Sequence, residues 1–123
     1  MYFINNISEQ LRNEKIHPER KYVAISVKHS EHGWRFGKPL TLWGYHRTAD
    51  DEERCFAGYT EVLSKAELYT IDDMSNHGYN GNICRKEPVH MSYDFCEKWK
   101  RYDSVLMEVG EYWSYCTMSG IDI

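Results

Sequence analysis

The chain has 123 residues, of which 41% are hydrophobic and 28% are charged, as expected for one globular domain over residues 1–123 with a single core. The formal net charge of −4 argues against a long nucleic acid as a partner, because sequence-independent binding relies on many Lys and Arg contacts with phosphates. No apolar run approaches the roughly 20 residues that a membrane-spanning helix needs, so we expect no membrane partner.

Aromatic residues make up 15% of the chain, including ten tyrosines and four tryptophans. Rings beyond those that a small core holds are typical of interfaces and ligand sites, so we expect part of this set to serve binding. The four cysteines are widely spaced, and the N-terminal residues lack the pattern of a secretory signal. We therefore expect reduced thiols and a cytoplasmic protein.

The N-terminal part of the chain predicts one helix and one strand. Apolar residues at helical spacing indicate an amphipathic helix over 3–14, and the proline at position 18 ends it. Alternating side chains then predict a strand over 21–29. Its core-facing residues are aliphatic, while Ser26 and Lys28 belong to the opposite, small and polar face.

Two glycines flank an aromatic–arginine–aromatic segment within residues 30–38, which predicts a hairpin or a loop. Trp34, Arg35 and Phe36 on such a loop suit stacking on a nucleotide base. The alternative is a loop tip that packs back onto the sheet.

Residues 39–60 predict two strands on either side of an acidic turn. Alternation from residue 40 to 47 separates a core face from a second face. The side chains expected on that second face are Thr41, Trp43, Tyr45 and Arg47. The partner strand adds Arg54 and ends with Thr60. Rings and hydroxyls between guanidinium groups suit a flat anionic ligand, whereas the alternative is that the rings pack under a helix or against a second subunit.

The second half of the chain gives weaker patterns. We expect an irregular stretch with a short strand near 66–69, a helix that begins at Thr70, and a turn-rich loop over 79–88. A further helix follows Ser92 and ends near residue 103. The remaining elements are predicted to be an apolar strand over Val105–Val109 and an aromatic strand over Glu111–Met118.

These elements predict an α+β fold, namely a mainly antiparallel sheet with two or three helices on one face. The other face, with Trp43 and Tyr45, is then exposed unless a partner covers it. We therefore expect a homodimer or a larger homo-oligomer.

Motifs of well-known catalytic sites are absent from the sequence. It has no glycine-rich phosphate loop, no dinucleotide fingerprint, no nucleophile elbow and no zinc-protease motif. The histidines at 29 and 32 with Glu31 do not fit a metal-ligand spacing, and the cysteines are interpreted as core residues. We expect a protein that is not an enzyme and that uses no metal and no cofactor.

Three segments, YVAISVKHSEHGWRFGKPLTLWGYHRTADDEERCFAGYT, AELYTIDDM and FCEKWKRYDSVLMEV, together resemble the phage Thoeris anti-defence sponge family. The likeness is to the smaller type, which sequesters glycocyclic ADP-ribose. It implies an assembly in the cytoplasm of the infected bacterial host that binds a cyclic ADP-ribose isomer made by a TIR-domain enzyme. The signal is withheld from the immune effector without cleavage, and cyclic oligonucleotides are a further ligand class of the family.

The family has no short signature, so the predicted ligand residues come from the patterns above. Rings are offered by Trp34, Phe36, Trp43 and Tyr45, charges by Lys28, Arg35, Arg47 and Arg54, and hydroxyls by Ser26, Thr41 and Thr60. One alternative is a small phage inhibitor that binds a host defence protein through the aromatic face. Another is a metal-dependent phosphodiesterase that uses the acidic residues 50–53.

Overall fold

The structure is a computed structural model that describes residues 19–45, 54, 56–76, 85 and 87–123. The predicted helix over 3–14, the acidic turn and Arg47 lie outside these residues. The described elements are β1 (Tyr22–Ser26), α2 (Val27–Ser30), β2 (Leu42–Trp43), β3 (Tyr59–Thr60), a 3-10 helix (Leu63–Lys65), α3 (Ile71–Asn76), α4 (Phe95–Trp99), β4 (Ser104–Glu108) and α5 (Val109–Ser119).

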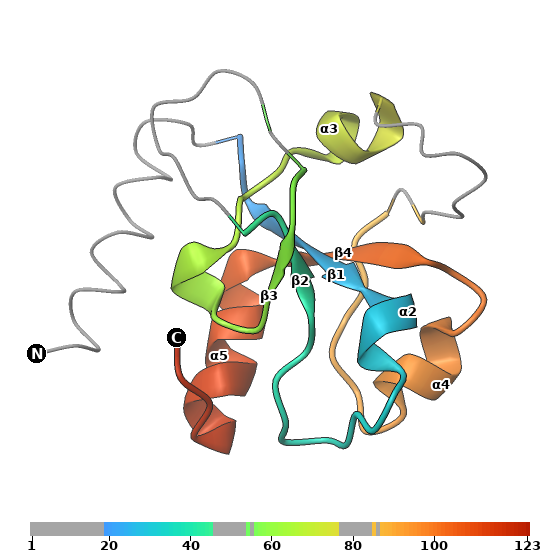
Figure 1. The fold of residues 1–123 in the computed structure, drawn as a ribbon, viewed down its shortest axis with the longest axis vertical. Coiled ribbons are helices and arrows are strands. Elements are labelled where there is room, and N and C mark those ends of the chain that lie inside the picture. The colour runs from blue at the N-terminus through green and yellow to red at the C-terminus, as the bar shows by residue number, and fades with distance from the viewer. Residues whose placement is uncertain (1–18, 46–53, 55, 77–84, 86) are drawn as a thin grey trace, which may run out of the picture.

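Four strands form one antiparallel sheet in the order β3-β2-β1-β4 (Figure 1). The longest ladder joins β1 to β4, with Val23 opposite Met107 and Ala24 opposite Leu106. Sheet and helices together confirm the predicted α+β fold. Among the described residues, no helix has the length and apolar character that crossing a membrane requires.

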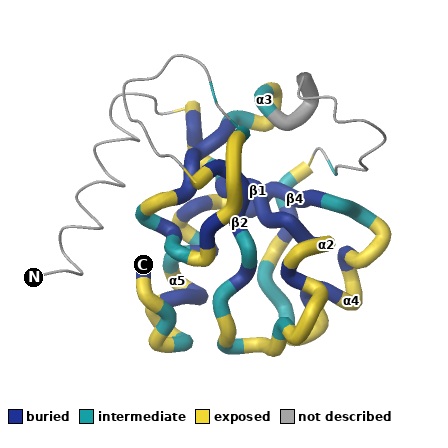
Figure 2. Tube along the Cα trace, viewed as in Figure 1, coloured by how far each residue is buried: buried dark blue, intermediate teal, exposed yellow. Residues whose placement is uncertain are grey.

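Strands β1 and β4 are buried on both faces, and Figure 2 shows most of their residues in the buried class. Because side chains alternate along a strand, Val23 and Ile25 join the main core, whereas Ala24 joins a second cluster. Side chains of α4 and α5, including Phe95 and Tyr112, pack in the main core on the same side as Val23. This arrangement agrees with the prediction of helices on one face.

The second face of the sheet is covered by the chain itself, so the expectation that it lies open is wrong for Trp43. That side chain is only 7% exposed and clusters with Ala24, Leu106 and Tyr69. Tyr69 exchanges two backbone hydrogen bonds with Tyr22, at 2.8 and 3.1 Å. The short extended stretch predicted near 66–69 is therefore present as a bridge that holds the Tyr69 ring over the sheet.

Residues 111–118, predicted as a strand, belong to helix α5 instead. Its buried residues Val109, Tyr112, Tyr115 and Cys116 recur every three or four positions, which is the spacing of one helix face. Gly120 ends the helix in the left-handed conformation at φ 70°, and Ile121 N donates to Cys116 O at 2.8 Å. Aromatic and β-branched residues favoured a strand locally, and packing on the sheet overrides that preference.

Three predicted strands are shorter than expected. The first ends at Ser26, because the Ser26 side chain accepts a hydrogen bond from His29 N and starts the helical turn α2. The second ends at Trp43, because the φ of 82° at Gly44 does not continue a strand, and the third covers Tyr59–Thr60. Residues 31–38 form the turns that their two glycines predict.

Candidate functional site

Most of the predicted ligand residues that the structure describes fall into two environments. Ser26, Trp43 and Thr60 are buried, and the Arg54 side chain is 1% exposed. These residues contribute to the interior of the fold, so their role as ligand contacts stays a prediction that has no open surface to support it.

Arg54 belongs to an enclosed ion pair. Its Nη1 lies 3.8 Å from Oε2 of Glu67, a side chain with no exposed surface, and it donates to Leu68 O at 3.4 Å. The other carboxylate oxygen of Glu67 accepts from Phe56 N at 2.8 Å and from the Tyr69 hydroxyl at 3.1 Å. The Phe56 and Tyr69 rings stack at 4.8 Å and close this cluster. The Arg54 cation, which the sequence assigned to a ligand platform, is therefore paired within the protein.

The second environment is a surface hollow between α2 and β2, which we call the loop hollow. It has a volume of about 320 Å³ and is open to solvent. Its main lining residues are His29, His32, Trp34, Arg35, Lys38 and Thr41, with Glu61 on the side. Three of them, Trp34, Arg35 and Thr41, are predicted site residues that the structure brings together.

The walls of the loop hollow are held by local hydrogen bonds. The Ser30 hydroxyl donates to Ser26 O at 2.7 Å and accepts from Thr41 N at 2.9 Å, which joins α2 to the start of β2. The Trp34 indole donates to Lys38 O at 3.2 Å and closes the turn between them. The ring of Trp34 therefore has a defined position before any ligand binds.

Two tyrosines of helix α5 form hydrogen bonds with the backbone of the same loop. The Tyr115 hydroxyl donates to Lys38 O at 2.6 Å and accepts from Gly37 N at 2.9 Å, while the Tyr112 hydroxyl accepts from Leu40 N at 3.0 Å. Burial raises the pKa of both tyrosines, so both hydroxyls keep their protons at neutral pH. Residues 111–118, which the sequence predicted as a strand, therefore hold the loop of the candidate site in place.

Positive charge dominates the loop hollow. Arg35 and Lys38 are exposed cationic side chains, and no ion pair of the described residues engages either one. His29 adds a ring whose Nδ1 lies 2.7 Å from the Ser26 hydroxyl and whose centroid lies 4.3 Å from that of Tyr59. Glu61 is the carboxylate of this lining. The arrangement favours an anionic ligand.

A second hollow continues from the first. Its volume is about 360 Å³, and it shares Lys38, Pro39 and Glu61 with the loop hollow before it reaches Ser119 and Asp122. The shared residues lie between these two neighbouring hollows, which we together call the groove. The groove offers cations at one end and a carboxylate with a hydroxyl at the other.

Three predicted residues lie elsewhere. Lys28 is exposed on α2 but does not line the groove, and Tyr45 is exposed next to Gly58, whose added Cβ would contact the Tyr45 side chain. Phe36 does not line the groove and belongs to a different hollow. The predicted ligand set does not contain His29, His32 and Lys38, which line the loop hollow. Their positions on either side of the two glycines could have indicated that they meet at the loop.

Metal ligands and nucleophilic thiols are two kinds of group that a cleavage reaction can use. Within 19–45, 54, 56–76, 85 and 87–123, no three His, Cys, Asp or Glu side chains gather as metal ligands. Cys96 and Cys116 are buried free thiols, and burial raises the pKa of each to about 11. Both thiols stay protonated at neutral pH, which confirms that these two cysteines are core residues and poor nucleophiles.

Comparison with known proteins gives no relative for this chain: no protein-family model, curated protein or solved structure matches it.

Proposed function

We propose that this protein binds a small anionic nucleotide in the groove and sequesters it without cleavage. The observation that carries this proposal is the loop hollow, where the Trp34 ring and the cations Arg35 and Lys38 surround one cavity. The ligand we propose is the one that the sequence resemblance implies, a cyclic ADP-ribose isomer such as glycocyclic ADP-ribose.

The groups of such a ligand match the groove. Two phosphates call for guanidinium and ammonium donors, which Arg35 and Lys38 provide. A purine stacks on an aromatic side chain such as Trp34. Ribose hydroxyls and the purine amino group require acceptors, and Glu61 with Asp122 lies along the continuation of the groove.

Enclosure is the remaining requirement of a sponge, because an open groove leaves much of the ligand in water. We propose that a second copy of the chain covers the groove, in line with the assembly that the sequence resemblance implies. In an infected bacterium, this capture would keep the signal of a TIR-domain enzyme from its immune effector.

Calorimetric titration with glycocyclic ADP-ribose tests the proposal. Losing one hydrogen bond to a charged group costs about 1.5–3 kcal/mol, so Arg35→Ala and Lys38→Ala should each weaken binding roughly ten- to a hundredfold. Both side chains are exposed, so the melting temperature should stay the same. Lys21→Ala is the matched control, since Lys21 is an exposed cation at the opposite end of β1.

Heat denaturation of the loaded protein separates capture from cleavage. Release of intact signal into the supernatant supports sequestration. Permanent loss of the signal, prevented by a chelator, would indicate a metal-dependent phosphodiesterase instead. Failure of the protein to deplete the signal from solution would overturn the proposal.

A further inference from the structure

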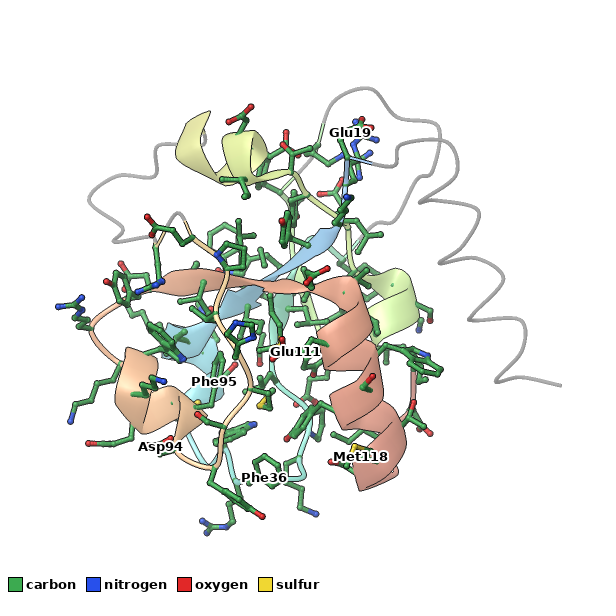
Figure 3. All side chains as sticks on the ribbon, turned by 180° about the vertical axis from the view of Figure 1, so that it is seen from behind. Glu19, Phe36, Asp94, Phe95, Glu111 and Met118 are labelled. Atoms are coloured by element: carbon green, nitrogen blue, oxygen red, sulfur yellow. The ribbon has the colours of Figure 1, made fainter. Side chains whose placement is uncertain are left out.

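A separate hollow is lined by residues 31–36 and by residues 93–97. We call it the ring pocket; its volume is about 260 Å³. Its lining combines three rings with three carboxylates, from Trp34, Phe36, Tyr93, Glu31, Asp94 and Glu97. Figure 3 shows Phe36 and Asp94 at the same end of the molecule.

The rings of this pocket are unusually exposed. Tyr93 is 82% exposed and Phe36 is 44% exposed, although their ring centroids lie 4.3 Å apart. The Phe36 ring also meets the rings of Tyr115 and Trp34 edge to face, with centroid distances of 5.4 and 6.5 Å. The core therefore holds Phe36 in place, and Tyr93 extends its surface into solvent. An exposed aromatic surface of this kind is typical of an interaction site.

The charge around the rings is negative. Asp94 is exposed, and its side chain makes no capping hydrogen bond to α4. Glu31 faces the same pocket, whereas Glu97 is paired with Lys100 at 2.6 Å. Arg35 is the cation of the lining. Three carboxylates therefore face two cations, Arg35 and Lys100, which leaves a net charge of one carboxylate beside the rings.

We propose that the ring pocket binds the guanidinium group of an arginine on a protein partner. A planar cation stacks on aromatic faces while its N–H groups donate to carboxylates, and arginine is less strongly hydrated than lysine. Phe36 and Tyr93 supply the faces, and Asp94 supplies the acceptor.

This site is distinct from the nucleotide groove. Tyr93 and Asp94 do not line the groove, and Lys38 does not line the ring pocket. Trp34 and Arg35 lie between the two sites and line both hollows. Variants of Tyr93 and Asp94 therefore test the ring pocket without removing a nucleotide contact.

The experiment uses the full chain labelled with ¹⁵N and titrated with two blocked tripeptides. Acetyl-Ala-Arg-Ala-amide should shift the backbone amide signals of Phe36, Tyr93 and Asp94 and saturate at millimolar concentration. The second peptide replaces arginine with citrulline, which has nearly the same shape and no charge. It should bind at least fivefold more weakly.

Two variants and one control locate the binding. Tyr93→Ser and Asp94→Asn should each weaken binding of the arginine peptide about five- to tenfold, and both side chains are exposed, so folding is preserved. Met118→Ser is the control, because Met118 is 87% exposed on α5 and lines none of these hollows. Lys38→Ala should keep peptide affinity while it loses the nucleotide.

Equal affinities for the arginine and citrulline peptides would overturn the proposal, because the pocket would then not select a cation. Unchanged binding in Tyr93→Ser would overturn it as well. Loss of peptide binding in Lys38→Ala would show that the peptide occupies the nucleotide groove instead.

Discussion

The enclosed ion pair at Arg54 and the loop hollow at Arg35 contain the same kinds of residue in opposite environments. Each places a guanidinium group near an aromatic ring. At Arg54 the side chain is 1% exposed, and its partner Glu67 is completely buried. In the loop hollow, Arg35 and Lys38 project into solvent beside the half-buried ring of Trp34.

The difference shows that a cation beside a ring indicates a binding site only where its donors remain open. A ligand phosphate at Arg54 would have to displace the Glu67 carboxylate and open the packed rings of Phe56 and Tyr69. Breaking a buried charge pair costs several kcal/mol. The exposed donors of Arg35 and Lys38 exchange only water for phosphate oxygens.

The comparison is tested most strongly by Glu67→Ala. This change leaves Arg54 buried without its carboxylate and removes the acceptor of Phe56 N and the Tyr69 hydroxyl. We expect a loss of about 3–5 kcal/mol in the free energy of unfolding, measured by urea denaturation. Glu87→Ala is the control, since the side chain is exposed and should change stability by less than about 0.5 kcal/mol. A loss below 1 kcal/mol in Glu67→Ala would mean that the cluster is not enclosed.

Gly44→Ala probes the same enclosure through the backbone. Gly44 has a φ of 82°, and an added Cβ would meet the Tyr69 hydroxyl and lie 2.8 Å from Glu67 Cβ. Backbone strain and overpacking together should cost about 2–4 kcal/mol. Gly33→Ala is matched in φ, at 80°, but its Cβ would meet nothing within 4 Å, so strain alone should cost about 1 kcal/mol. Equal melting temperatures of the two variants would contradict the enclosed cluster.

The sequence predicts the centre of this fold well. Alternation in 21–29 and the apolar run 105–109 mark two strands, and these pair over five residues as β1 and β4. Helix α5 was misassigned because its rings have strand propensity, while the spacing of its buried residues is helical. Packing against the sheet decides between strand propensity and helical spacing, and the local sequence does not reveal this packing.

The site is harder to predict from the sequence, because it also depends on packing between residues that are far apart in the chain. Alternation places Trp43 and Ala24 on one face but does not reveal that Tyr69, far along the chain, covers that face. The groove forms because Ser26 caps a turn where a strand was expected, which brings His29 next to the loop 30–38. A single capping hydroxyl therefore changes which side chains meet.

Tyr115→Phe tests how the core supports the open site. The change removes the hydroxyl that bridges Lys38 O at 2.6 Å and Gly37 N at 2.9 Å. Tyr115 is buried, but its two hydrogen bonds are only partly buried, so water can reach the backbone groups and stability should fall by about 0.5–1.5 kcal/mol. Affinity for glycocyclic ADP-ribose should fall a few-fold, because the loop then has to be ordered on binding. Tyr102→Phe is the control, because it removes a hydroxyl that accepts from Arg101 Nη2 and does not contact the loop, and it should leave affinity unchanged. If calorimetry shows the same affinity for Tyr115→Phe and the parent protein, α5 does not position the groove.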